Sequence, residues 1–167
     1  MTVAVVLDTV VLLQAAAKPA GPAGACLRLV TDGQVVLWMS REGLAEIEDV
    51  LNRPKVRQRF PSLTDEAVTT FLTGLRGRAR VVEDVPEVVP FPRDPDDEHV
   101  LNLAVTSRAD FLVTRDHDLL DLAGEGNADA SRLRGLAPGL RIVDPATFLR
   151  VVAEGQGQTL GGAEPTP

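Results

Sequence analysis

The sequence predicts one α/β domain built around a central, mostly parallel sheet. The run 3–7 is continuously apolar and rich in valine, which is typical of a strand buried on both faces of a parallel sheet. Further strand candidates at 34–39, 111–114 and 140–143 alternate along the chain with segments of helical periodicity. This β-α-β-α order favours parallel strands, because a parallel pair needs a crossover connection.

Helices are expected between these strands. Ser40 is a good N-cap for a helix whose apolar residues repeat every 3.6 positions until Pro54 ends it. Asp94 followed by Pro95 predicts another start, since proline at the first helical position gives up no needed N–H, and this helix should reach about Ser107. Other helices are expected at 23–31, at 64–75 and from 144 onward, with a short extended piece at 80–83.

The length of 167 residues fits one domain, which we place at residues 1–154. Residues 155–167 are mostly glycine, proline, threonine and glutamine with little to bury, so we predict a disordered C-terminal tail. The chain begins directly in a strand without a basic leader, and no apolar run approaches the ~20 residues of a membrane-spanning helix. We therefore expect a cytoplasmic protein with no membrane partner.

A single cysteine, Cys26, can form no internal disulfide or thiolate zinc site and is expected to fill the core. His99 and His117 lack partners at zinc-ligand spacing and are expected at the surface. The net charge of −7 argues against a broadly nucleic-acid-binding surface, but it does not exclude a local basic patch.

Acidic residues gather where the predicted strands end. Asp8 and Asp116 follow two strands at the edge of the sheet where open α/β folds place their functional crevice. Asp97 lies in the first turn of a helix, and Glu46 lies about two turns into the helix after Ser40. Four carboxylates converging there would repel one another unless divalent cations neutralised them, and magnesium or manganese prefers such oxygen ligands.

Each of these acids also has a structural interpretation. Asp8 could cap the following turn, and the acids at 94, 96 and 97 crowd a helix start, where negative charge is favoured. We assign Asp94 to the cap. Glu46 and Glu48 both flank an apolar stripe, so periodicity cannot choose between them. We prefer Asp116 as a ligand, with Asp118 as a supporting ligand or as an N-cap of the residues that follow.

Taken as a set, these segments resemble the PIN-domain family, and within it the branch described as toxin components of bacterial toxin–antitoxin pairs. The resemblance spans residues 3–151 and is strongest in the motifs Arg-Asp-Pro-x-Asp, at 93–97, and Thr-x-Asp-x-Asp-Leu-Leu, at 114–120. It implies a three-layer α/β/α sandwich and a metal-dependent endoribonuclease. The implied metal-binding, catalytic acids are Asp8, Glu46, Asp97 and Asp116, with Asp118 and Thr114 near them and Ser40 opening the acidic helix.

One position departs from the family pattern. The family usually has Asp-Thr-Asn-Val after the first strand, and here Val10 occupies the asparagine position. Because residues around metal ligands hold them in place, this change could weaken metal affinity or activity. The alternative to a nuclease is therefore a catalytically weakened PIN fold that binds RNA or a protein.

The expected substrate is RNA, cut by metal-activated water without a protein nucleophile, and the expected partner is an inhibitory antitoxin. A homodimer is compatible with this interpretation. The densest basic run, Arg53, Lys55, Arg57 and Arg59, is a candidate for phosphate contacts, with a solvated linker as the alternative. A phospho-receiver domain fits poorly, and dinucleotide or P-loop binding is disfavoured because the glycine-rich motifs are absent.

Overall fold

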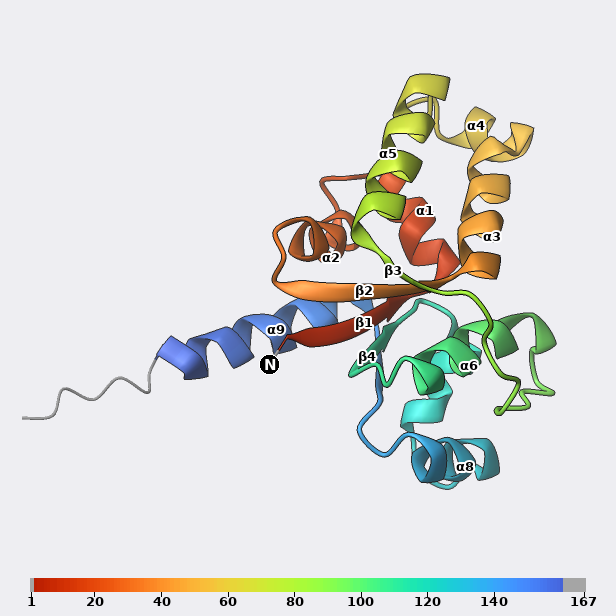
Figure 1. Cartoon of the computed structure of the whole chain (residues 1–167), viewed down its shortest axis with the longest axis vertical. Coiled ribbons are helices and arrows are strands. Elements are labelled where there is room, and N and C mark those ends of the chain that lie inside the picture. Colours follow the sequence, from red (N-terminus) through yellow and green to blue (C-terminus); the bar gives the residue numbers. More distant parts are fainter. Residues whose placement is uncertain (1, 161–167) are drawn as a thin grey trace, which may run out of the picture.

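The computed structural model describes residues 2–160 and confirms the predicted α/β architecture (Figure 1). Its five-stranded sheet has the order β3-β2-β1-β4-β5, and every neighbouring pair is parallel. The strands are β1 (Val3–Leu7), β2 (Val35–Ser40), β3 (Arg80–Val82), β4 (Phe111–Val113) and β5 (Arg141–Val143). All five strand predictions are confirmed to within a residue or so at each end.

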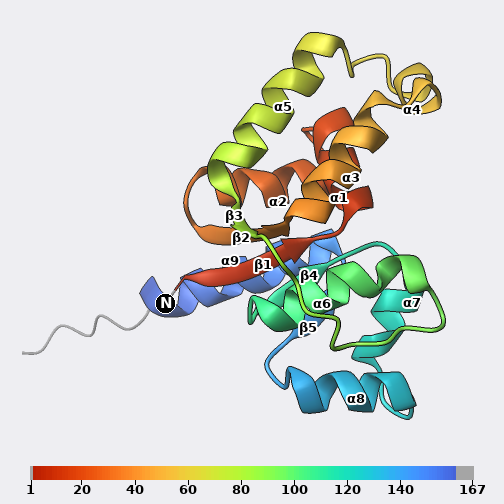
Figure 2. The same ribbon diagram turned by 45° about the vertical axis from the view of Figure 1, so that its right-hand side comes forward.

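Helices cover both faces of this sheet, which gives the three-layer sandwich. The α-helices are α1 (Thr9–Ala17), α2 (Pro22–Thr31), α3 (Arg41–Asn52), α4 (Pro54–Arg59), α5 (Asp65–Arg78), α6 (Glu98–Thr106), α7 (His117–Leu120), α8 (Ala128–Leu136) and α9 (Pro145–Leu160). Two 3-10 turns, η1 (Pro95–Asp97) and η2 (Asp121–Ala123), precede α6 and follow α7. Figure 2 shows α1 to α5 on one side of the sheet and α6 to α8 on the other.

Alternate residues of the central strand serve two separate cores. Val5 and Leu7 pack with α1, α2, α3, α5 and α9, whereas Val6 packs with α6, α7 and α8 on the opposite face. This alternation follows from the two-residue period of a strand and explains why β1 is apolar at every position. Cys26 is fully buried in the first of these cores, as predicted.

Four helices, α1, α4, α7 and α8, lie outside the helical ranges expected from the sequence. Pro54 does follow the end of α3, but it also occupies the first turn of α4, where its missing N–H costs nothing. Helices α7 and α8 are short, at 4 and 9 residues, and their apolar residues are too few to give a clear periodicity. Asp116, and not Asp118, is the N-cap of α7, because its side chain accepts a hydrogen bond from the Asp118 N–H.

The C-terminal prediction needs a correction. Helix α9 continues to Leu160, so residues 155–160, which we predicted to be disordered, are helical. The rest of the predicted tail, 161–167, lies outside the described residues. None of the helices within 2–160 is long and apolar enough to cross a membrane alone; α1 and α2 meet those criteria only as a pair, and that pair is bent by 94°.

Candidate functional site

The candidate site lies at the carboxyl ends of β1 and β4, where the strand order reverses direction. In open parallel sheets this switch point is where a crevice forms. The pairing of Leu7 with Val113 brings the two strand ends into register, and the Asp8 N–H donates to the Val113 carbonyl at 3.0 Å. Asp8 and the residues that follow Val113 therefore meet at one edge, as the sequence predicted.

Thr114 links two of the predicted acids. Its buried hydroxyl donates to Asp8 Oδ2 at 2.8 Å and accepts a hydrogen bond from the Asp116 N–H at 3.0 Å. The other oxygen of Asp8, Oδ1, accepts from the Thr9 N–H at 2.7 Å and caps α1. The side chain of Asp8 is thus held in one orientation at the strand end.

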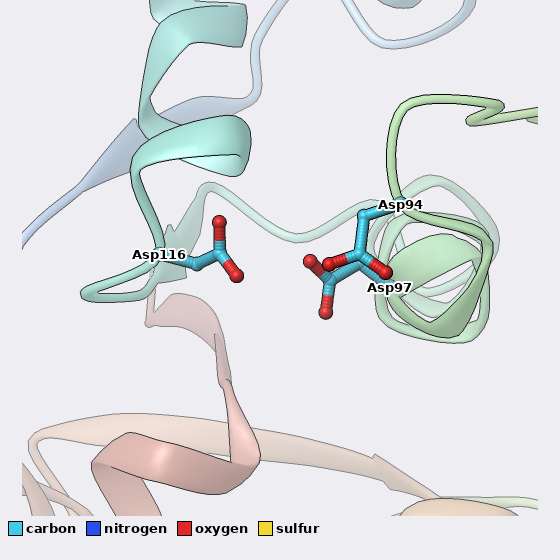
Figure 3. Close-up of side chains that lie close together, drawn as sticks. All are labelled: Asp94, Asp97 and Asp116. Carbon is cyan, nitrogen blue, oxygen red and sulfur yellow. The ribbon is translucent and has the colours of Figure 1, made fainter.

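Three carboxylates form the centre of the site. Asp94, Asp97 and Asp116 each offer an oxygen, and these oxygens lie within 4.8 Å of one another. Figure 3 shows Asp94 and Asp97 on one ribbon segment, facing Asp116 across the gap. Asp94 does cap η1, as predicted, through a hydrogen bond from the Asp96 N–H, but its carboxylate also belongs to this acid group. The sequence-based assignment of Asp94 to a cap alone was therefore incomplete.

The negative charges of these acids raise one another's pKa values, as Asp8 and Asp97 show. The pKa of Asp97 is raised to about 8, mainly by burial and then by the negative charges of Asp8, Asp116 and Asp94 and a hydrogen bond with Asp116. Burial also raises the pKa of Asp8, opposed by its hydrogen bonds from Thr114 and Thr9. Repulsion from Asp116 and Glu46 adds to the pKa of Asp8, so the four predicted acids act on one another.

Glu46 approaches the group from α3, and its neighbour Glu48 does not. Glu48 pairs with Arg76 at 2.7 Å on the outer side, which resolves the ambiguity between the two glutamates. His99 Nε2 lies 3.1 Å from Glu46 Oε2, so the prediction that His99 is a surface residue was wrong; its side chain is only 22% exposed. Ser40 opens α3 as expected, because its hydroxyl accepts from the Gly43 N–H at 2.8 Å.

Two oxygens of the site are suited to a cation. Asp97 Oδ2 and Glu46 Oε2 are buried, and neither accepts a hydrogen bond of good geometry among the described residues; Glu46 Oε2 has only the 3.1 Å contact with His99 Nε2. A buried anionic oxygen without a partner is costly, and a hard divalent cation with oxygen ligands would satisfy it. The donor set, all carboxylate and with no cysteine, fits magnesium or manganese better than softer metals.

Asp118 is directed elsewhere. Its Oδ1 lies 2.7 Å from Arg93 Nε, and Arg93 also reaches Asp121 at 2.7 Å. The carboxylate of Asp118 is thus neutralised by an arginine and stands outside the acid group. This contact gives no support to Asp118 as a ligand, and Arg93 was not singled out by the sequence because its partners lie 25 and 28 residues away.

The basic run is largely engaged within the protein. Arg53 pairs with Asp49, and Arg57 donates to the carbonyls of Leu51 and Leu63 and pairs with Asp65 at 2.9 Å. Arg57 therefore joins the ends of α3 and α5. Arg59 and Lys55 are exposed, and Arg59 lies over an aromatic ring. Phosphate binding by this run stays a prediction, with Arg59 and Lys55 as its available members.

A model of the PIN domain family matches residues 4–118, which include Asp8, Glu46, Asp97 and Asp116. No curated protein and no solved structure gave a match.

Proposed function

The chain belongs to the PIN domain family, and on this premise we propose that it is an endoribonuclease that depends on magnesium or manganese. The observation that carries the proposal is the group of carboxylates at the switch point. Two buried oxygens that accept no hydrogen bond, Asp97 Oδ2 and Glu46 Oε2, add to it. A site that accumulates negative charge in this way is built to bind cations, and PIN domains are generally nucleases.

Asp94, Asp97 and Asp116 would hold the metal, and the charges of Asp8 and Glu46 would add to the attraction for it. A bound divalent ion would supply Lewis acidity toward the phosphodiester and lower the pKa of water at neutral pH. Thr114 would keep Asp8 and Asp116 in fixed positions through its two hydrogen bonds. The acid group needs no serine, cysteine or histidine nucleophile for hydrolysis.

We further propose, from the family resemblance, that the protein is the toxin of a toxin–antitoxin pair and acts in the cytoplasm. The acid group supports an inhibitor that presents an arginine, because a guanidinium can bind a carboxylate in bidentate fashion and replace the metal's charge. Within the chain, Arg93 already neutralises Asp118 near the site through its Nε. Growth that is unaffected by overexpression, with no small protein co-purifying, would contradict this role.

The weakened-nuclease alternative rests on Val10. Its side chain is 47% exposed next to Asp8 and offers no polar atom to the site. A protein that binds single-stranded RNA but leaves it intact in the presence of manganese would fit this alternative.

The test is cleavage of a labelled single-stranded RNA with manganese, with magnesium and with chelator. The parent should cut only with metal, and Asp97→Asn and Asp116→Asn should not cut. Asp110→Asn is the matched control, because Asp110 accepts a hydrogen bond from the Ala4 N–H far from the acid group and asparagine can also accept it. Cleavage in chelator, or in the two site variants, would refute the proposal.

A further inference from the structure

A second pocket is distinct from the one beside His99, which is lined by the acidic residues 42, 87, 96 and 98. It has a volume of about 260 Å³ and brings together three cations, Lys18, Arg59 and Arg115. They come from three separate segments, the end of α1, the end of α4 and the loop after β4. Arg115 immediately precedes Asp116, so the pocket begins beside the acid group.

The charges of this pocket have no carboxylate in direct contact among the described residues, although Arg115 and Asp144 attract each other at longer range. Lys18 Nζ and the guanidinium of Arg59 lie over the ring of Phe60, at 5.8 and 5.4 Å from its centroid. Within residues 2–160, none of the three cations forms an ion pair. Three like charges around one cavity repel one another, and an anion bound between them would relieve the repulsion.

The backbone adds to this preference. Gly21, Pro22 and Ala23, at the N-terminus of the ten-residue helix α2, line the same pocket, and the N-cap Gly21 has no side chain to satisfy the first N–H groups. The positive end of the helix dipole therefore faces the cavity together with the three cations. Phe60 supplies an aromatic surface of the kind on which nucleic-acid bases stack.

We propose that this pocket binds a backbone phosphate of the RNA strand whose cleavage is proposed above, and the inference rests on that proposed function. The acidic pocket beside His99 repels a polyanion, and the basic pocket attracts it. We therefore expect the RNA strand to run from the acid group toward Phe60. Of the basic run predicted from the sequence, only Arg59 belongs to this phosphate site. The other two cations of the site are Lys18 and Arg115.

The test is the salt dependence of binding to a fluorescently labelled single-stranded oligoribonucleotide, measured by anisotropy in chelator so that nothing is cut. Lys18→Gln, Arg59→Gln and their combination remove exposed side chains, which should leave the fold intact, as thermal melting can verify. Because the pocket binds one phosphate, its complete loss in the double variant should flatten the slope of log affinity against log salt by about 0.7, and each single variant by less.

Arg141→Gln is the matched control. Arg141 also lies 5.4 Å from the centroid of a phenylalanine ring, that of Phe111, but at the amino ends of the strands. Removal of the Arg141 charge should leave the slope of log affinity against log salt unchanged.

Three outcomes would overturn the assignment: no RNA binding by the parent, an unchanged slope in the double variant, or equal loss in Arg141→Gln. Competition by polyglutamate as effective as that by RNA would also overturn it, in favour of an acidic protein partner. If the parent binds RNA with the expected slopes but cuts nothing with manganese, the phosphate pocket stands and the proposed nuclease function fails.

Discussion

The metal-free protein should become less stable as the pH rises from 5 to 9. Folding raises the pKa of Asp97 from 3.8 to about 8, first through burial and then through the charges of Asp8 and Asp116. Between pH 3.8 and about pH 8, Asp97 of the folded protein holds a proton that the unfolded chain has released. The stabilisation is therefore fully present below about pH 4 and is lost as the pH rises through the folded pKa.

The structure sets the size of this effect. Each pH unit between the two pKa values corresponds to ~1.36 kcal/mol, so the interval from 3.8 to about 8 gives a ceiling of roughly 6 kcal/mol. Asp97 is only partly buried, and solvent and salt screen the repulsion. We expect the free energy of unfolding to fall by about 1–2 kcal/mol from pH 5 to pH 9. Asp97→Asn should remove most of this dependence and be the more stable protein at pH 9.

The assay is urea unfolding at pH 5, 7 and 9 in chelator, repeated with manganese. An ion at about 100 times its Kd should stabilise the parent by ~2.7 kcal/mol, and Asp97→Asn by less. Asp144→Ala is the control, because Asp144 caps α9 through the Thr147 N–H and lies outside the acid group; hydrogen bonding to Thr147 is the main cause of its lowered pKa. It should lose ~1 kcal/mol at every pH, with or without metal. A parent whose stability is flat from pH 5 to 9, or an equal response of Asp97→Asn to manganese, would refute the reasoning.

Three further substitutions test other parts of the structure. Thr114→Val should cost ~1–3 kcal/mol in urea unfolding, because it leaves the buried Asp8 Oδ2 without its donor; an unchanged midpoint would contradict this link. Phe148→Ala should cost ~3–5 kcal/mol, since its ring is fully buried, yet it should leave manganese affinity by calorimetry unchanged. Val10→Asn should raise the rate of RNA cleavage with a stability change within ~0.5 kcal/mol, because Val10 is exposed; an unaltered rate would show that this position does not influence the site.

The sheet was predictable because its signals are local. The central strand is buried on both faces, so residues 3–7 show an unbroken apolar run, and the parallel order follows from the helical segments between strands. Helix α4 was not predictable in the same way. Pro54 ends one helix and starts the next, and α4 buries none of its side chains completely, so neither composition nor periodicity marks it.

The site was predictable only in part. Asp8 and Asp116 follow adjacent parallel strands, and register alone brings them together. The choice between Glu46 and Glu48 depends on Arg76, which is 28 residues from Glu48 and lies on another helix. His99 was missed for the same reason, because its partner lies 53 residues before it and only the packing of α6 against α3 brings them together.

Capping and metal binding, which the sequence presents as competing explanations for the acids, are compatible in the structure. Asp8, Asp94 and Asp116 each accept a backbone hydrogen bond at a helix start through Oδ1, which fixes the carboxylate and leaves Oδ2 free of the cap. Asp97 makes no such capping bond, and its Oδ2 is buried without a partner. The capping bonds thus hold three carboxylates in place, whereas no such bond opposes the effects of burial and neighbouring charge on Asp97, whose pKa rises to about 8. A bound cation should therefore act most strongly on Asp97. The ionisation of Asp97 should report metal binding.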